Sequence, residues 1–405
     1  MRRIAWLLML LFAFVIPWEY SLDLGAPLGN IARLTGLLVL VVAVPAVFAS
    51  GRLRDPGCVQ WLVLALYLWL CCTYFWSIEP QTTLQKLRGF FQTMMIVWLI
   101  WEFAESAGNL RALLRVIVAG SWVLAILTVI DFASAHAAAA AQIRFAAAGQ
   151  DPNDVARFLN LCFPLAALLF TSERRWAGRL LAGGYLPLGL LAVLLTASRG
   201  GFLAALVSLA GSAVLLAYGR PGLARAGALA LPPLLVLLWL TVPRATLARL
   251  GTIPEQLERG SLNQRWNIWE AGWHAFAHAP IAGTGAGTFI TAAGTASFDT
   301  AHNTALSLAV GGGLCALFLA VAIVAAAAWS IAQTHGSLRG ALLTALLALL
   351  TASLVATVEE SRSTWLLIGV MALAGRLAAE KPEEMEAVFP RATHFQQSPH
   401  RFHAQ

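Results

Sequence analysis

Apolar residues dominate the chain in long segments that are separated by short polar turns. An α-helix needs about 20 apolar residues to cross the hydrocarbon core of a bilayer. Segments near this length are predicted to be membrane-spanning helices at 4–18, 31–49, 58–76, 89–104, 113–133, 154–171, 179–196, 201–218, 224–242, 303–330, 338–358 and 363–379. The pattern therefore predicts an all-α, multi-pass membrane protein with about twelve transmembrane helices.

The composition agrees with a membrane protein. Apolar residues make up 59% of the 405 positions and charged residues only 12%, whereas soluble domains are about one quarter charged. The net charge of +7 comes from Lys and Arg in short loops and does not indicate a nucleic-acid partner. The five cysteines show no paired pattern that would imply disulfides or a metal framework.

Basic residues alternate between the two ends of the predicted spans, which sets the orientation. One set of turns holds Arg2, Arg3, Arg52, Arg54, Arg111, Arg115, Arg174, Arg175, Arg179, Arg220, Arg225 and Arg339. Loops rich in Lys and Arg stay in the cytoplasm, so we expect both termini to be cytoplasmic. The segment 4–15 resembles a signal peptide, but no small-residue cleavage site follows it, and we expect it to remain as the first span.

This orientation divides the chain into four parts. Residues 1–242 hold spans one to nine, 243–302 form one large periplasmic loop, 303–379 hold spans ten to twelve, and 380–405 form a cytoplasmic tail that we expect to be disordered. The loop is the only long polar interruption, so we expect the function to reside there.

Several basic residues lie at the outer ends of spans, where the orientation rule predicts few: Lys86, Arg88, Arg144, Arg157, Arg199, Arg265 and Arg362. Charge at membrane depth is costly and usually marks function. For Lys86, Arg88, Arg157 and Arg244 we favour the structural explanation, which is snorkelling to lipid phosphates or pairing with acids such as Glu359 and Glu360.

Two of the outer arginines are candidates for a ligand site, Arg199 in a tight turn and Arg144 in the outer loop 134–152. Arg199 has no acidic residue nearby in sequence, so it either pairs with a distant carboxylate or faces an anionic ligand, and we favour the ligand. Arg144 precedes a turn and helix start, 149–154, in which Asn153 or Asp154 can cap the helix. We include Arg144 because its loop shares the outer face with Arg199 and Arg265.

The large loop itself contains an amphipathic helix signal. Ser261–Gln264 has the form of a capping box, and Pro280 ends the run. Apolar residues follow at helical spacing: Leu262, Trp266, Trp269, Trp273 and Phe276. We expect this helix to lie along the membrane surface or over the helix ends, with Arg265 in a first turn that favours an anion rather than merely snorkelling.

The loop ends at the best catalytic candidate, His302, at the start of the next apolar span. Its alternative role is interfacial packing, but Asp299 is close enough in sequence to orient its ring. The glycine-rich run 283–289 follows no strand and lacks a Walker lysine, so it is a weak nucleotide motif, and a bend packed against helix ends explains it as well.

Arginines that converge on one outer cavity with a histidine predict binding of a phosphate or pyrophosphate. No metal or other cofactor is expected, because no closely spaced pair of acids accompanies these arginines. A histidine, with an ordinary pKa of about 6.5, can take a proton from a hydroxyl nucleophile. These groups predict transfer from a phosphate-activated, lipid-borne donor to an alcohol.

The motifs resemble those of the O-antigen ligase/polymerase superfamily of bacterial envelope enzymes. The resemblance rests on the turn 198–201, on the segment from Arg265 and Trp269 through Pro280 and the glycines to His302 and Asn303, and on the run 150–153. Within the superfamily, the length and the single large loop look most like the O-antigen ligase. The resemblance implies a multi-pass protein of the bacterial inner membrane with a periplasmic active site.

The implied reaction transfers O-antigen polysaccharide from undecaprenyl pyrophosphate to a sugar of lipid A-core, with inversion of the anomeric centre. Carried over by motif, Arg265 and Arg199 would hold the pyrophosphate, and His302 would be the base or would position the acceptor hydroxyl. We add Arg144 to the pyrophosphate site, and list as supporting residues Asn153, Trp269, Asp299, Asn303 and Arg362. Membrane lipids are the other expected partners.

Alternative functions use similar groups. An O-antigen polymerase has the same donor but a lipid-linked glycan as acceptor, and the sequence barely separates the two. Protein O-oligosaccharyltransferases of the superfamily usually have a longer C-terminal region. A transporter of the same lipid would also need a cationic cavity, but not the histidine, and would be expected to show internally repeated halves.

Overall fold

The computed structural model of the chain describes residues 1–25, 29–137, 142–258, 265–296 and 300–390. In these ranges the chain is helical and forms no strand. Eleven of the described helices are long and apolar enough to cross a membrane. They are α1 (Arg2–Val15, continued by a 3-10 turn, Ile16–Ser21), α2 (Ile31–Ser50), α3 (Cys58–Cys72, continued by a 3-10 turn, Thr73–Trp76), α5 (Ala107–Ala137), α6 (Pro152–Ser172), α7 (Trp176–Leu195), α8 (Arg199–Gly219), α9 (Pro221–Thr241), α14 (Thr304–Gln333), α15 (Gly336–Ser353) and α16 (Arg362–Glu380).

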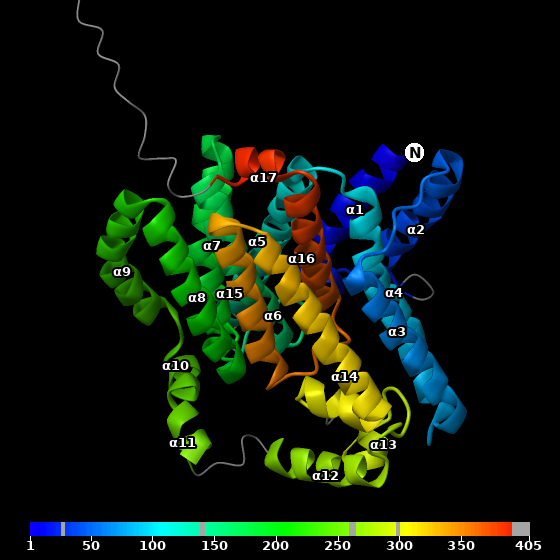
Figure 1. Cartoon of the computed structure of the whole chain (residues 1–405). Helices are drawn as coiled ribbons and strands as arrows, with labels where there is room; N and C mark the ends of the chain where they lie inside the picture. The colour runs from blue at the N-terminus through cyan, green and yellow to red at the C-terminus, as the bar shows by residue number, and fades with distance from the viewer. Residues whose placement is uncertain (26–28, 138–141, 259–264, 297–299, 391–405) are drawn as a thin grey trace, which may run out of the picture.

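The remaining predicted span, 89–104, belongs to α4 (Pro80–Phe103). This helix is not among the eleven, because its first turns are polar and include Lys86 and Arg88. It nevertheless packs within the bundle, against α16 and α3 (Figure 1). The prediction of an all-α, multi-pass membrane protein is therefore confirmed.

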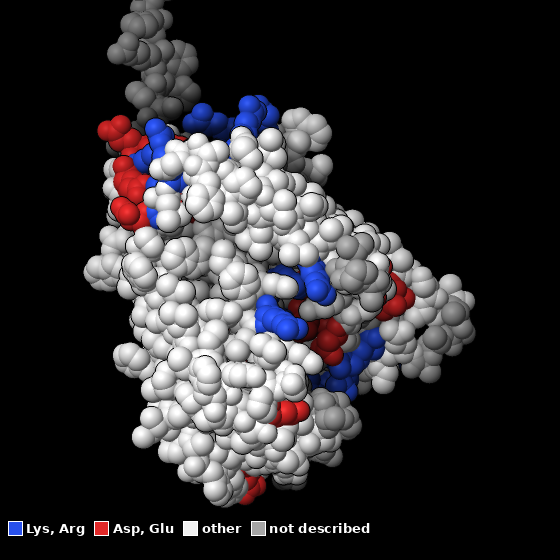
Figure 2. Space-filling model, turned by 90° about the vertical axis from the view of Figure 1, so that its right-hand side faces the viewer, with Lys and Arg blue, Asp and Glu red and all other residues white. Residues whose placement is uncertain are grey.

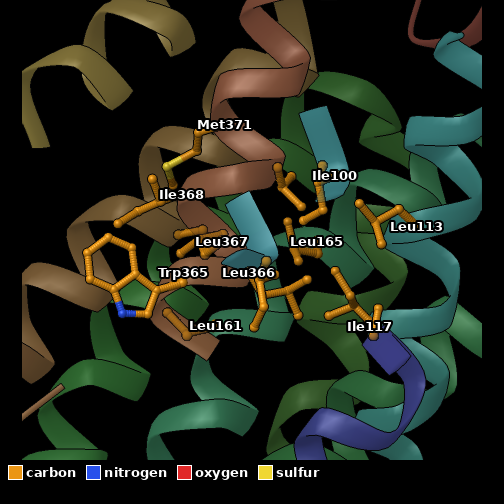
Figure 3. Packing of buried hydrophobic residues seen from close by; sticks show 14 of the residues in the cluster. Ile100, Leu113, Ile117, Leu161, Leu165, Trp365, Leu366, Leu367, Ile368 and Met371 are labelled. Carbon is orange, nitrogen blue, oxygen red and sulfur yellow. The ribbon is translucent and has the colours of Figure 1, made fainter. Parts of the chain in front are cut away.

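The core of the bundle is built around α6 and α16, which are buried over most of their length. Figure 3 shows Leu161 and Leu165 of α6 packed close to the run 365–371 of α16, with Ile100 of α4 beside them. By contrast, α9 lies at the edge of the bundle (Figure 1) and has one buried residue, Leu238. The exposed apolar side chains of α9 are those that a lipid-facing helix presents.

The two ends of the bundle differ. The N-terminus and α17 (Pro382–Val388) lie at one end (Figure 1). The segments of the large loop, α10 (Arg244–Gly251), α11 (Ile253–Glu258), α12 (Arg265–His278) and α13 (Phe289–Ala293), lie at the other. The polar loop therefore covers the end of the bundle that is remote from both termini of the described chain.

Charged side chains gather at two levels of the molecule. Figure 2 shows basic and acidic residues together at the end that holds the N-terminus, and a second group in a hollow nearer the opposite end. At the N-terminal end, Arg2 forms an ion pair with Glu102, and Arg115 pairs with the buried Glu173. The zone between the two levels is almost free of charge on this face, as expected for the part that faces hydrocarbon.

The amphipathic helix of the loop forms as α12, and the face by which it packs on the protein is not the tryptophan-rich face. Trp266 and Trp273 are 64% and 62% exposed, and the face that packs on α13 and α14 carries Ile268, Gly272 and Ala275. The small residues Gly272 and Ala275 allow the helices to approach closely. The spacing of the tryptophans did not reveal this contact. The predicted capping box at 261–264 lies outside the described residues.

The glycine-rich segment packs against a break in α14, as the sequence indicated. Gly313 has a φ of 66°, so the helix is interrupted there. The backbone amides of Thr284 and Gly285 donate to the carbonyls of Val310 and Gly311 at 2.8 and 2.9 Å, and the amide of Leu314 donates to Pro280. The loop therefore supplies the hydrogen bonds that the broken helix cannot make internally.

This contact predicts a large difference between two glycine substitutions. Gly283 and Gly294 have similar φ angles, +71° and +63°, so an alanine is strained at either position by about 1–2 kcal/mol. Only at Gly283 would the new Cβ come within 2.6 Å of the Gly311 backbone, whereas at Gly294 nothing lies within 4 Å. We expect Gly283→Ala to lower the melting temperature in detergent clearly more than Gly294→Ala. Equal melting temperatures would contradict this packing.

Candidate active site

A cavity of about 540 Å³ opens at the end of the bundle covered by the large loop. Its walls come from the 3-10 turn after α1, the first turns of α4 and α6, the start of α12, and the segments before α14 and α16. Arg265 and His302 both line it, together with Asn153. The structure therefore brings together two residues that the sequence predicted to share a site.

Arg265 is the first residue of α12 and is partly buried. Its guanidinium makes no hydrogen bond or ion pair with any other residue in the part of the chain that the structure describes. Burial lowers the pKa of the Arg265 side chain, the charges of Arg144 and Arg199 lower it further, and Asp151 opposes the shift. Arginine remains a cation at neutral pH, so an anion bound here would relieve the repulsion.

Trp269 links the helix that carries Arg265 to the segment that carries His302. It lies one turn further along α12, and its indole Nε1 donates to the carbonyl of Ala301 at 3.0 Å. Ala301 is buried and directly precedes His302. The contact fixes α12 relative to the segment that carries the histidine, which is consistent with the supporting role predicted for Trp269.

His302 directly precedes the capping residue of α14. The cap is Asn303, whose side chain accepts from the amide of Leu306 at 3.0 Å. His302 has a φ of 46°, in a left-handed region that is uncommon for residues other than glycine. Such strain is often found at functional sites. Asp299, predicted to orient the ring, lies outside the described residues; the hydroxyl of Thr300 lies 3.4 Å from Nδ1.

Asn153 forms hydrogen bonds with Arg144 and with Ser198, which precedes α8. Its Oδ1 accepts hydrogen bonds from Arg144 Nη2 at 2.9 Å and from Ser198 Oγ at 2.8 Å. Asn153 and Asp154 were predicted as possible caps of α6, but the cap is Asp151, which accepts from the amide of Asn153. Asn153 is therefore free of the capping role and instead holds Arg144 beside the start of α8.

Arg199 lies next to the cavity rather than in its wall. Its Nη2 donates to Thr252 Oγ1 at 2.7 Å and its Nε to the carbonyl of Arg249 at 3.3 Å, both in the α10–α11 region. Its charge nevertheless acts on Arg265. Arg199 therefore contributes to the potential of the site, and its contact with ligand remains a prediction.

Arg362 is placed by an ion pair. It is the first residue of α16 and pairs with Glu19, a buried residue of the cavity wall. The pair connects the start of α16 to the turn that follows α1. This geometry fits the supporting role predicted for Arg362, since the charge of Arg362 is balanced by a protein group.

Two basic residues of the wall were given only a structural role from the sequence. Lys86 does pair with Glu360, at 2.6 Å, as expected. Arg157 pairs with Asp154, at 2.9 Å, rather than with Glu359 or Glu360. Both basic residues also line the cavity. From the sequence, snorkelling or an ion pair accounted for the charge of Arg157, so its position in the site was not predicted.

Glu359 makes the site region sensitive to pH. Burial raises the pKa of this carboxyl to about 7, and the charge of Glu360 adds to the shift. A carboxyl whose pKa is raised in the folded state stabilises the protein below its ordinary pKa of 4.5, and this contribution is lost as the pH rises through about 7. Melting temperatures of Glu359→Gln should therefore fall less than those of the wild type between about pH 5 and pH 8.

Glu270, exposed on α12, provides the matched control. Glu270→Gln should retain the wild-type dependence of melting temperature on pH. The same dependence in Glu359→Gln and the wild type would show that Glu359 does not cause it.

Together, the fold and the cavity define a polytopic α-helical membrane protein with a basic pocket at the end remote from its described termini. Residues 184–321 match the family model described as O-antigen ligase. The match supports the resemblance to the O-antigen ligase superfamily over these residues. Arg199, Arg265 and His302 lie within the matched residues, whereas Arg144, Asn153 and Arg362 lie outside them. No curated protein matches the chain.

The family match narrows the functional class. It implies a glycosyltransferase of the ligase or polymerase kind, acting on lipid-linked glycans in a bacterial membrane. It does not separate a ligase from a polymerase, because both belong to the superfamily.

Proposed function

We propose that this protein is an O-antigen ligase, which transfers O-antigen polysaccharide from undecaprenyl pyrophosphate to a sugar hydroxyl of lipid A-core. The observation that carries the proposal is that Arg265 and His302 line the same cavity. Arg265 has no protein partner among the described residues and can receive the diphosphate. His302 in the same wall can receive the proton of the acceptor.

The reaction follows from these two groups. The acceptor oxygen attacks the anomeric carbon, the bond from that carbon to the diphosphate oxygen breaks, and undecaprenyl pyrophosphate leaves. His302 takes the hydroxyl proton, and Arg265, with the charges of Arg199 and Arg144 nearby, stabilises the negative charge that develops on the leaving group. Attack from the face opposite the leaving group inverts the anomeric centre. In this mechanism guanidinium groups stabilise the charge of the leaving diphosphate, which is the role of a divalent ion in other transferases.

The orientation of the site is part of the proposal. The basic turns, including those of Arg2 and Arg115, lie at the end of the bundle that carries the N-terminus. If basic turns stay in the cytoplasm, the cavity opens to the periplasm. Nucleotide-activated donors are not expected there, which favours a donor preassembled on a lipid.

The test is reconstitution of the purified protein with lipid-linked O-antigen and rough lipopolysaccharide, in EDTA and without ATP. Glycan joined to lipopolysaccharide is the expected product. Elongated lipid-linked glycan would instead identify a polymerase, which the family match also allows. Absence of both products, with transfer of the lipid across vesicles, would identify a transporter and contradict the proposal.

A further inference from the structure

Arg157 is an almost fully buried guanidinium next to the proposed site. It is 8% exposed and lies one turn into α6. It lines the large cavity and also a small neighbouring cavity of about 30 Å³. Arg265 lines both cavities as well. The two guanidinium groups therefore border the same spaces, although they come from distant parts of the chain.

The hydrogen-bonding capacity of Arg157 is only partly used. Nη1 lies 2.9 Å from Asp154 Oδ1, and Nη2 donates to Ser361 Oγ at 3.2 Å. Nε is buried and has no hydrogen-bond partner among the described residues. A buried donor without an acceptor is costly, so this nitrogen points to a ligand or a water molecule as its partner.

The small cavity adjoins the first turn of α8. Gly200 and Gly201, the second and third residues of α8, form part of its wall together with Ser198 and Val355. The start of a long helix attracts negative charge through its backbone amides. A volume of about 30 Å³ accepts an oxygen-sized group such as water, and is too small for a whole phosphate.

We propose that Arg157 is a further phosphate-binding residue of this site. One phosphoryl oxygen of the donor enters the small cavity between Arg157 and the first turn of α8, while Arg265 contacts the same diphosphate from the large cavity. Without the donor, Asp154 pairs with one nitrogen of Arg157, and it competes with the phosphoryl oxygen for that charge. This inference rests on the proposed function, because the anion is the diphosphate of the lipid donor.

The competing explanation is that Arg157 serves only to pair with Asp154, and the two explanations predict different results. Binding of inorganic pyrophosphate to the full-length protein in detergent is measured by calorimetry for the wild type, Arg157→Gln and Asp154→Asn. We expect Arg157→Gln to raise Kd about tenfold or more, since it removes charged hydrogen bonds. Asp154→Asn should bind as well as the wild type or better, because a competing carboxylate is lost.

The control is Arg88→Gln, which removes an exposed arginine from the same end of the molecule and should leave Kd unchanged. Equal losses in Arg157→Gln and Asp154→Asn, or a wild-type Kd in Arg157→Gln, would overturn the inference. If Arg157→Gln does not fold, Arg157→Lys replaces it; it should bind more weakly than the wild type, and an unchanged Kd would overturn the inference. If the wild type does not bind pyrophosphate, both this inference and the diphosphate site of the proposed function are overturned.

Discussion

Arg265→Ala should reduce glycan transfer to lipopolysaccharide by about 10³-fold while the protein still inserts and folds. Removing one positioned donor to a developing negative charge costs about 10²–10³-fold in rate, and an arginine directed at a transferring phosphoryl group contributes about 10³–10⁵-fold. Arg265 should lie at the upper part of the first range, because it is partly buried and lacks a protein partner among the described residues. Initial rates in the reconstituted assay measure the effect.

Two variants calibrate this result. Arg265→Lys keeps the charge but loses the bidentate geometry of guanidinium, and should retain an intermediate rate. Arg244→Ala removes an exposed arginine at the start of α10, in the same loop, and should transfer at the wild-type rate. A wild-type rate from Arg265→Ala would exclude the residue from the site.

His302→Ala should lower the rate by about 10²–10⁴-fold, the contribution expected of a general base. Only neutral imidazole accepts a proton, so the wild-type rate should fall as the pH is lowered and the ring becomes protonated. The residual rate of the variant should lack that fall on the acid side. Rates measured across pH therefore separate a base from a residue that only positions the acceptor, which would lower the rate without changing its pH dependence.

A second substitution at His302 is needed to separate a catalytic effect from an effect on the backbone. Its φ of 46° would strain an alanine, so His302→Ala alone could act through the fold. Asparagine tolerates this conformation, and His302→Asn should fold with a wild-type melting temperature but remain as slow as His302→Ala. His274→Ala, on the exposed side of α12, should have no effect. Wild-type activity in His302→Asn would contradict the assignment of His302 as the base.

Much of the fold could be predicted because its cause is local. A run of apolar residues long enough to span a bilayer becomes a helix whatever its neighbours are, and every predicted span corresponds to a helix of the bundle. A bend at the glycine-rich run was among the interpretations that the sequence allowed. The buried face of α12 was not predictable, because Gly272 and Ala275 are buried by α13 and α14, which pack on them from elsewhere.

The site was predicted less completely than the fold. Local sequence context predicted Arg265 and His302 as site residues, because they belong to a long polar loop in an otherwise apolar chain. It could not show that Arg157 lines the same cavity, nor that Arg199 lies beside it. Snorkelling or pairing with an acid accounted for the charge of Arg157, whereas Arg199 has no acid nearby in sequence and was expected to face a ligand.

Hydropathy and charge along the chain therefore specify the number and kind of helices, because membrane insertion responds to each segment separately. Which arginines share a cavity depends on how α6, α8, α12, α16 and the 3-10 turn after α1 pack, and that packing joins side chains far apart in the sequence, such as Arg362 and Glu19. Such contacts leave no periodic signal along the chain, so the partners of each charge became known only from the folded molecule.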